Sequence, residues 1–174
     1  MTTRPLGRPA PDEYEQFYAN YISLVPDGDI LESLAGQRLD TDKLLSGIPE
    51  SNAGYRYAPD KWSIKGVVGH VVDSERVFSY RALSIGRGDP APLPGFDEKA
   101  WALTSHFDDR TLRDLVRDYG VVREATLALL RSLPAEAWPR RGTANNFSVT
   151  VRALAWIIAG HERHHLEVLR ERYL

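Results

Sequence analysis

Apolar residues recur at intervals of three and four along three long stretches of the chain, which is the pattern of an amphipathic helix with one buried face. The first stretch begins after a serine, a residue type that caps helix N-termini, and predicts a helix over residues 64–85. The second stretch ends at Pro134, which cannot continue a helix. The third begins near Ser148 or Thr150 and runs to Leu174. At least three long helices are therefore expected.

The N-terminal third has a more broken pattern. Residues 14–22 predict a short helix, residues 26–28 (Pro-Asp-Gly) a turn, and residues 30–45 one or two further helical pieces, which together supply the first helix of a bundle. Strand signals are weak, because no stretch of four to eight residues alternates cleanly between turn residues. These patterns predict an all-α fold.

The joins between the predicted helices are long. Residues 86–109 contain three prolines and several glycines, and they are too many for a tight helical hairpin. The joins over residues 49–62 and 134–147 are long as well. A four-helix bundle with long crossover connections is therefore favoured over simple up-and-down topology. We expect one such domain over residues 12–174, preceded by an N-terminal tail of residues 1–11.

Composition narrows the class of protein. The chain has 174 residues, of which 43% are hydrophobic, and its 22 Lys and Arg nearly balance 24 Asp and Glu. The net charge is -2 and the sequence has no block of like charge, so it lacks the clustered positive charge that binds nucleic acid or anionic lipid. Neither nucleic-acid nor membrane binding is therefore expected. The N-terminal segment lacks the apolar run of a secretory signal, which favours a cytoplasmic location. Since the chain has no cysteine, any thiol chemistry needs a thiol that arrives with the substrate.

Three of the five histidines lie in the last predicted helix. His161 and His165 fall near the centre of its apolar arc, whereas His164 lies at the margin and is excluded as a ligand. Buried imidazoles need partners for both ring nitrogens, and one shared divalent cation would serve two of them at once. The alternative is that both are ordinary core histidines, hydrogen-bonded to hydroxyl or backbone groups.

A third histidine completes the candidate site. His70 lies at the flank of the apolar stripe of the helix over residues 64–85, facing a neighbouring helix. Three imidazoles without thiolates suit Zn²⁺ or Ni²⁺ best, and Fe²⁺ or Mn²⁺ less well. Three protein ligands leave coordination positions for water or substrate, which favours chemistry over a purely structural ion.

Other polar and aromatic residues of these helices admit two interpretations each. Asp73 and Ser74 could orient the His70 imidazole, or Asp73 could be solvated. Glu75 lies inside the apolar stripe, where an ion pair with Arg123 is favoured over a role as base or ligand. Trp156 projects away from the histidines and covers either the N-terminal segment or a dimer partner.

A recognisable family pattern occupies four stretches of the sequence: residues 57–78, 93–97, 141–145 and 153–173. These stretches resemble the DinB superfamily, the DinB/YfiT-like metalloenzymes. The resemblance extends from about residue 12 to the C-terminus and departs from the family pattern at residues 145–148, where a more Gly/Pro-rich link is expected. It implies a four-helix bundle with a divalent metal held by His70, His161 and His165.

The resemblance leaves the reaction open, because the family includes proteins similar to thiol-dependent S-transferases, isomerases and hydrolases. The leading hypothesis is a metal-dependent transferase that acts on a small-molecule substrate with a low-molecular-weight thiol, in detoxification or stress response. Alternatives are a metal-dependent hydrolase of the YfiT type, a non-catalytic metal-binding stress-response protein, and a helical interaction module without metal. Members of the family are often dimers, so a homodimer is expected, and residues 86–109 could roof the metal.

Overall fold

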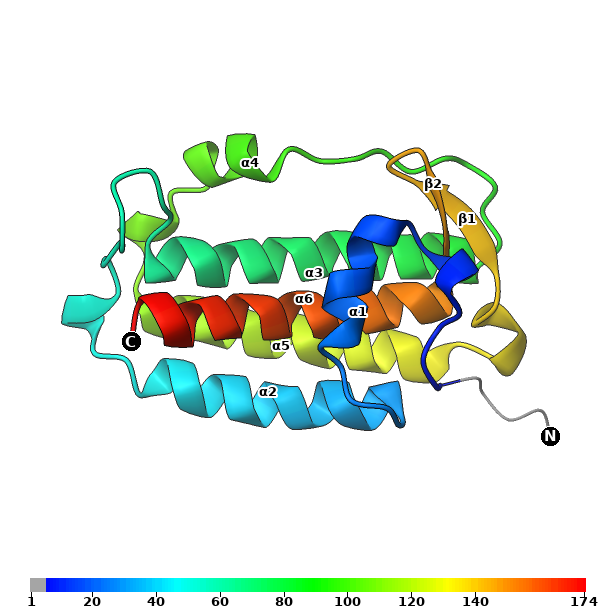
Figure 1. The fold of residues 1–174 in the computed structure, drawn as a ribbon, viewed down its shortest axis with the longest axis horizontal. Helices are drawn as coiled ribbons and strands as arrows, with labels where there is room; N and C mark the ends of the chain where they lie inside the picture. Colours follow the sequence, from blue (N-terminus) through cyan, green and yellow to red (C-terminus); the bar gives the residue numbers. More distant parts are fainter. Residues whose placement is uncertain (1–5) are drawn as a thin grey trace.

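Four long helices form a bundle in the computed structural model, which describes residues 6–174 (Figure 1). Helices α2 and α3 each pack against both α5 and α6, so α2 and α3 occupy opposite corners of the bundle. The expected four-helix bundle is thus confirmed, with a small hairpin added. The bundle helices are α2 (Ile30–Ser46), α3 (Ile64–Gly86), α5 (Leu112–Ser132) and α6 (Val151–Arg172).

Helix direction explains the long connection between α3 and α5. α3 and α5 run parallel to each other, as do α2 and α6, so the chain between α3 and α5 returns along the whole length of the bundle (Figure 1). Each bundle helix begins where a side chain accepts a hydrogen bond from the first turn, which satisfies a backbone N–H without an intrahelical partner. These caps are Asp29, Ser63, Thr111 and Thr150.

A β-hairpin precedes α6, where the sequence pattern gave no strand. Strands β1 (Arg141–Ala144) and β2 (Phe147–Thr150) pair antiparallel through a two-residue loop, Asn145–Asn146. Both loop residues have positive φ, 51° and 66°, a conformation that asparagine adopts more readily than most residues. Four-residue strands are too short for alternation to be read from sequence, and this loop is where the family pattern led us to expect glycine and proline.

The connection between α3 and α5 contains a further unexpected helix, α4 (Glu98–Thr104), capped by Asp97. The connection is held at both ends. At one end, the Leu93 N–H donates to the Thr143 carbonyl of the hairpin at 2.8 Å. At the other, the ring of Phe107 lies so close to Gly69 of α3 that a Cβ there would come within 2.4 Å of it. α4 thus lies over α3 between two fixed points (Figure 1).

The N-terminal segment packs on α6. Its short helix α1 (Ala19–Ser23) approaches so closely that a Cβ on Gly160 would lie 2.1 Å from the Tyr21 carbonyl oxygen. Trp156 is fully buried, its indole N–H donates to the Leu6 carbonyl at 3.3 Å, and the Arg8 guanidinium lies 4.9 Å from its ring centre. Trp156 therefore covers the N-terminal segment, and it no longer supports a dimer. No helix within residues 6–174 is both long and apolar enough to cross a bilayer.

Candidate metal centre

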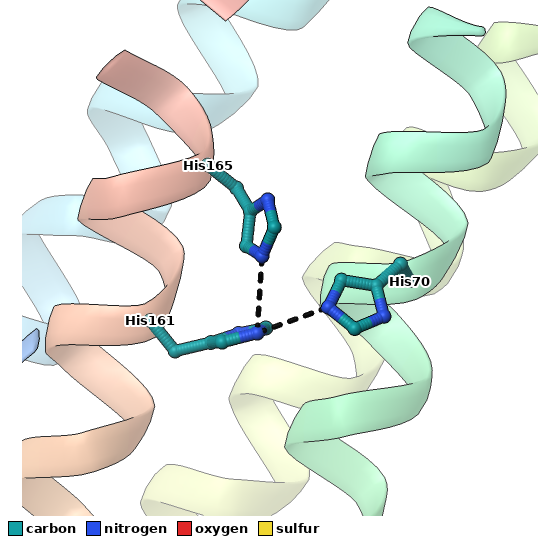
Figure 2. A group of neighbouring side chains, drawn as sticks. All are labelled: His70, His161 and His165. Atoms are coloured by element: carbon teal, nitrogen blue, oxygen red, sulfur yellow. Dashed lines mark hydrogen bonds between the residues drawn. The ribbon is translucent and has the colours of Figure 1, made fainter. Parts of the chain in front are cut away.

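Three imidazoles from two helices meet inside the bundle (Figure 2). His70 comes from α3, and His161 and His165 stand one turn apart on α6. The Nε2 atom of His161 lies 3.0 Å from that of His70 and 3.1 Å from that of His165. One nitrogen from each ring lies within 4.8 Å of the other two. Helical spacing brings His161 and His165 together, and the packing of α3 against α6 adds His70.

Burial keeps these rings uncharged. His70 and His161 are only 5% and 6% exposed. Removal from water lowers the pKa of His70 to about 4. Desolvation, followed by the charges of the neighbouring histidines, holds the pKa values of His161 and His165 well below the ordinary value of 6.5. All three imidazoles are therefore neutral at neutral pH, which is the form that binds metals.

Three converging ring nitrogens fit a metal ion better than they fit each other. The Nε2 atom of His161 lies at hydrogen-bonding distance from two others, yet a neutral imidazole nitrogen has either one proton or one lone pair to offer. Two nitrogens bound to one tetrahedral Zn²⁺ at about 2.0–2.1 Å stand roughly 3.3 Å apart, close to the two separations measured from the His161 Nε2 atom. Among residues 6–174, this is the one cluster with such a donor set.

Comparison with known proteins places the chain in a family. Residues 33–169 match the DinB superfamily, and this match includes all three histidines. The chain belongs to the DinB superfamily. Comparison with curated proteins gives no match.

A solved structure shares the fold of this DinB-superfamily chain. It is YfiT from Bacillus subtilis, described as a probable metal-dependent hydrolase with an unusual four-helix bundle topology. The two chains are 18% identical, the match covers 93% of this chain and 91% of YfiT, and the TM-score is 0.68. At this identity the similarity establishes the bundle topology alone. The activity of the present chain has to be inferred from its own residues.

The histidines of this DinB domain are surrounded by aromatic rings. Trp62 lies 4.7 Å from the His70 ring, and Tyr21 and Phe78 lie 5.4 and 5.7 Å from the His161 ring, between ring centres. Such walls limit the access of water to the imidazoles and help to keep them neutral. The contact with His70 places Trp62 at the site, which its position in the sequence did not reveal.

Ser74 and Asp73, the two residues considered as partners of His70, differ in whether they contact its ring. The Ser74 hydroxyl lies 3.5 Å from the His70 ring nitrogens, at the outer limit of a hydrogen bond. Asp73 instead accepts a hydrogen bond from Arg76 at 2.9 Å on the outer surface of α3. Of the two, only Ser74 contacts the imidazole.

A carboxylate that sequence reasoning missed faces the cluster. Glu98, the first residue of α4, has one oxygen 4.0 Å from the His70 Nε2 atom and is about half exposed. It directly follows one of the stretches that resemble the family, so its position was the only signal available in the sequence. A carboxylate there can accept a proton or supply an oxygen ligand.

Two hollows reach the cluster, and Glu98 lines both. The outer hollow, about 710 Å³, includes Trp62, His164 and His165 in its wall. His164 thus faces this hollow and stands outside the group of converging nitrogens, as expected. The inner hollow, about 140 Å³, includes His161 in its wall. Two hollows that share Glu98 therefore adjoin the histidine cluster.

Glu75 belongs to a buried ion-pair network behind the histidines. Its two oxygens accept hydrogen bonds from Arg123 at 2.8 Å each, and Arg123 also donates to Glu162 of α6 at 2.7 Å. Tyr119 and Thr41 donate to the same Glu162 carboxylate at 2.5 and 2.6 Å. The ion pair predicted for Glu75 is confirmed, and the alternative role as base or ligand is wrong because both of its oxygens are engaged.

Proposed function

We propose that this DinB-superfamily chain is a divalent-metal-dependent transferase that joins a low-molecular-weight thiol to a small electrophilic substrate. His70, His161 and His165 would hold the ion, with Zn²⁺ or Ni²⁺ preferred and Fe²⁺ or Mn²⁺ as weaker candidates. The observation that carries the proposal is the pair of hollows that meet at the histidines, because a transfer needs room for two reactants.

The metal's contribution would be to lower the pKa of a thiol or water bound beside the histidines. Glu98 supplies a carboxylate near His70 that can take the thiol proton. The thiol sulfur then forms a bond to the electrophilic carbon, and the leaving group departs with the electron pair of its own bond. The aromatic wall formed by Trp62, Tyr21 and Phe78 keeps water from competing for the electrophile.

A metal-dependent hydrolase is the second candidate, and the likeness to YfiT favours it. In that reaction water takes the place of the thiol, and the same carboxylate receives its proton. A non-catalytic protein of stress response, which only stores the ion or is stabilised by it, is the third. The proposed homodimer and cytoplasmic location are independent of this choice.

Metal content tests the first step. Elemental mass spectrometry is performed on tag-free protein purified without chelators, together with His70→Ala, His161→Ala and His106→Ala. His106 is a matched control, because its side chain is 77% exposed and lies outside the cluster. About one equivalent of metal in the parent and in His106→Ala, and none in the other two, supports the site. Absence of metal after reloading overturns it.

Turnover tests the second step. Glutathione and cysteine are supplied with chlorodinitrobenzene, and nitrophenyl acetate is supplied without thiol. Thiol transfer that requires metal and falls in Glu98→Gln supports the proposal. Ester hydrolysis alone favours the hydrolase, and loss of stability on chelation without any turnover favours the non-catalytic protein.

A further inference from the structure

Arg81 is a buried cation without an acidic partner. It lies on α3 and is 3% exposed, yet no carboxylate within residues 6–174 forms an ion pair with it. Its Nη2 group donates a hydrogen bond to the Pro94 carbonyl at 2.7 Å, and the guanidinium also interacts with the Tyr18 hydroxyl. Neither of these two oxygen atoms belongs to an acidic side chain, so the positive charge is not balanced by them.

A comparison within the same bundle shows what is unusual here. Arg123 is equally buried, and two glutamates, Glu75 and Glu162, balance its charge. Arg81 has instead the faces of Phe78 and Phe96, whose ring centres lie 5.7 and 5.9 Å from its guanidinium carbon. Aromatic faces attract a cation without neutralising it. Burial lowers the pKa of Arg81, but a guanidinium stays charged in proteins.

The unbalanced charge faces the inner hollow. This hollow of about 140 Å³ includes both Arg81 and the candidate ligand His161 in its wall. His70, Ser74, Phe78 and Arg81 follow one face of α3, at spacings of four, four and three residues. The hollow therefore connects the guanidinium to the histidine cluster along one side of this helix.

The hairpin adds a neutral polar group to the same wall. Asn145 lines the hollow from the tip of the hairpin, where its backbone N–H donates to the Leu93 carbonyl at 2.9 Å. Its side-chain oxygen lies so close to Gly95 that a Cβ there would come within 2.1 Å of it. The Asn145 amide is thus held in place beside the cavity.

Of the residues that the structure describes, Glu98 is the one acidic residue that lines the same hollow as Arg81. Its carboxylate lies 4.0 Å from the His70 ring and forms no ion pair with Arg81. The charge of Arg81 is thus left for a group that enters from outside.

We propose that the inner hollow is a carboxylate subsite, in which Arg81 and Asn145 bind the acid group of a substrate whose reacting atom lies at the histidines. Arginine binds carboxylates through two parallel hydrogen bonds. Arg81 follows His70 by eleven residues, which corresponds to about 16 Å of helix rise. The arginine side chain tilts toward the helix N-terminus and so covers part of this distance. The ligand is therefore an elongated carboxylic acid with a short apolar chain.

This inference names the substrate class of the proposed enzyme and rests on that function, but its binding step needs no metal. The probes are hexanoate and its neutral counterpart hexanamide, titrated calorimetrically into chelator-treated parent protein. Hexanoate is expected to bind at least about 10-fold more tightly, as for other hydrogen bonds to a charged group. Equal affinities, or no hexanoate binding at millimolar concentration, would overturn the proposal.

Variants identify the residue responsible. Arg81→Gln is expected to lose the preference for hexanoate, and Arg81→Lys to keep part of it. Arg76→Gln is the matched control, because it removes the same charge from the solvent side of α3 and should leave binding unchanged. If Arg81→Gln unfolds at a lower temperature, the comparison of the two probes in the parent and in Arg81→Lys still decides the question. An undiminished preference in Arg81→Lys and Arg81→Gln contradicts the assignment.

The outcomes separate the two proposals. Carboxylate binding that depends on Arg81, in a protein without any turnover, keeps the subsite and removes the transferase. Metal-dependent turnover of neutral and acidic electrophiles at equal rates keeps the enzyme and removes the subsite.

Discussion

His161 and Glu162 are consecutive residues of α6, yet their side chains serve different sides of the helix. His161 points to the imidazole of His70, and Glu162 accepts a hydrogen bond from the buried Arg123 of α5 at 2.7 Å. Two anchors one residue apart fix the rotation of α6 about its own axis. The ion pair behind the helix thereby determines where the histidines in front of it point.

Removal of the charge at Glu162 should therefore be costly. Glu162→Gln leaves Arg123 buried with one ion-pair partner fewer, and breaking a buried pair costs about 3–5 kcal/mol. Glu124→Gln is a matched control, because it breaks an exposed pair with Arg38, worth at most about 1 kcal/mol. Urea unfolding of the two variants measures the difference. Similar losses in both would contradict the role of the buried network.

The low pKa of His70 predicts how the stability of the metal-free protein changes in acid. Above pH 6.5 His70 is neutral in both the folded and the unfolded chain. Between pH 6.5 and about 4 the unfolded chain takes up a proton that the folded chain excludes, so stability falls as the pH falls. Below about pH 4 the decrease in the free energy of unfolding that is due to His70 reaches its limit, on the order of 3 kcal/mol.

Chelator-treated protein, unfolded in urea at several pH values, measures this effect. His70→Gln should show a shallower loss of stability between pH 6.5 and 4, because its side chain takes up no proton in this range. A parallel pH dependence in the parent and the variant would mean that His70 is not protected from protonation.

His164 and His165 should differ in metal binding although they are adjacent. His165 belongs to the converging group, whereas His164 lies beside it and faces the outer hollow. His165→Ala is expected to weaken metal binding by a factor of about 100 or more, and His164→Ala by less than about 10. Competition with a colorimetric chelator measures both affinities. A larger loss of affinity in His164→Ala than in His165→Ala would mean that the ligand had been assigned to the wrong histidine.

Gly69 should tolerate no larger residue while Phe107 is present. A Cβ at this position would lie 2.4 Å from the Phe107 ring, so Gly69→Ala forces the connection away from α3, at a cost of about 1–3 kcal/mol. The double variant Gly69→Ala with Phe107→Ala should lose less than the sum of the two single changes. Thermal or urea unfolding of all three proteins checks the coupling, and additive losses would exclude it.

The sequence allowed the bundle helices and the pair of His161 and His165 to be predicted for one physical reason. Helix periodicity is local, and the spacing of His161 and His165 places both on one face without knowledge of the rest of the chain. The capping residue Ser63 marked a helix start that the structure confirms, and of the two candidates for the last helix, Ser148 and Thr150, the structure has Thr150 as the cap. Only the pairing of His70 with the other two required the packing of distant helices.

The elements that were missed depend on contacts between segments far apart in the sequence. The hairpin is held by the connection at Leu93, and Glu98 reaches the site only because that connection returns along the bundle. Neither has a periodicity that a short window can reveal. Arg81 did have a signal, since it shares a helix face with His70, but its lack of an acidic partner is visible only in three dimensions.

The histidines stand on α3 and α6, whereas Glu98 and Asn145 come from α4 and from the hairpin tip, which lie outside the four bundle helices. The helices that hold the histidines are thus separate from two of the segments that a ligand in the hollows would contact. For protein engineering, α4 and the hairpin tip are exchangeable parts on a constant scaffold. Libraries confined to these two segments should alter ligand preference while the bundle still folds.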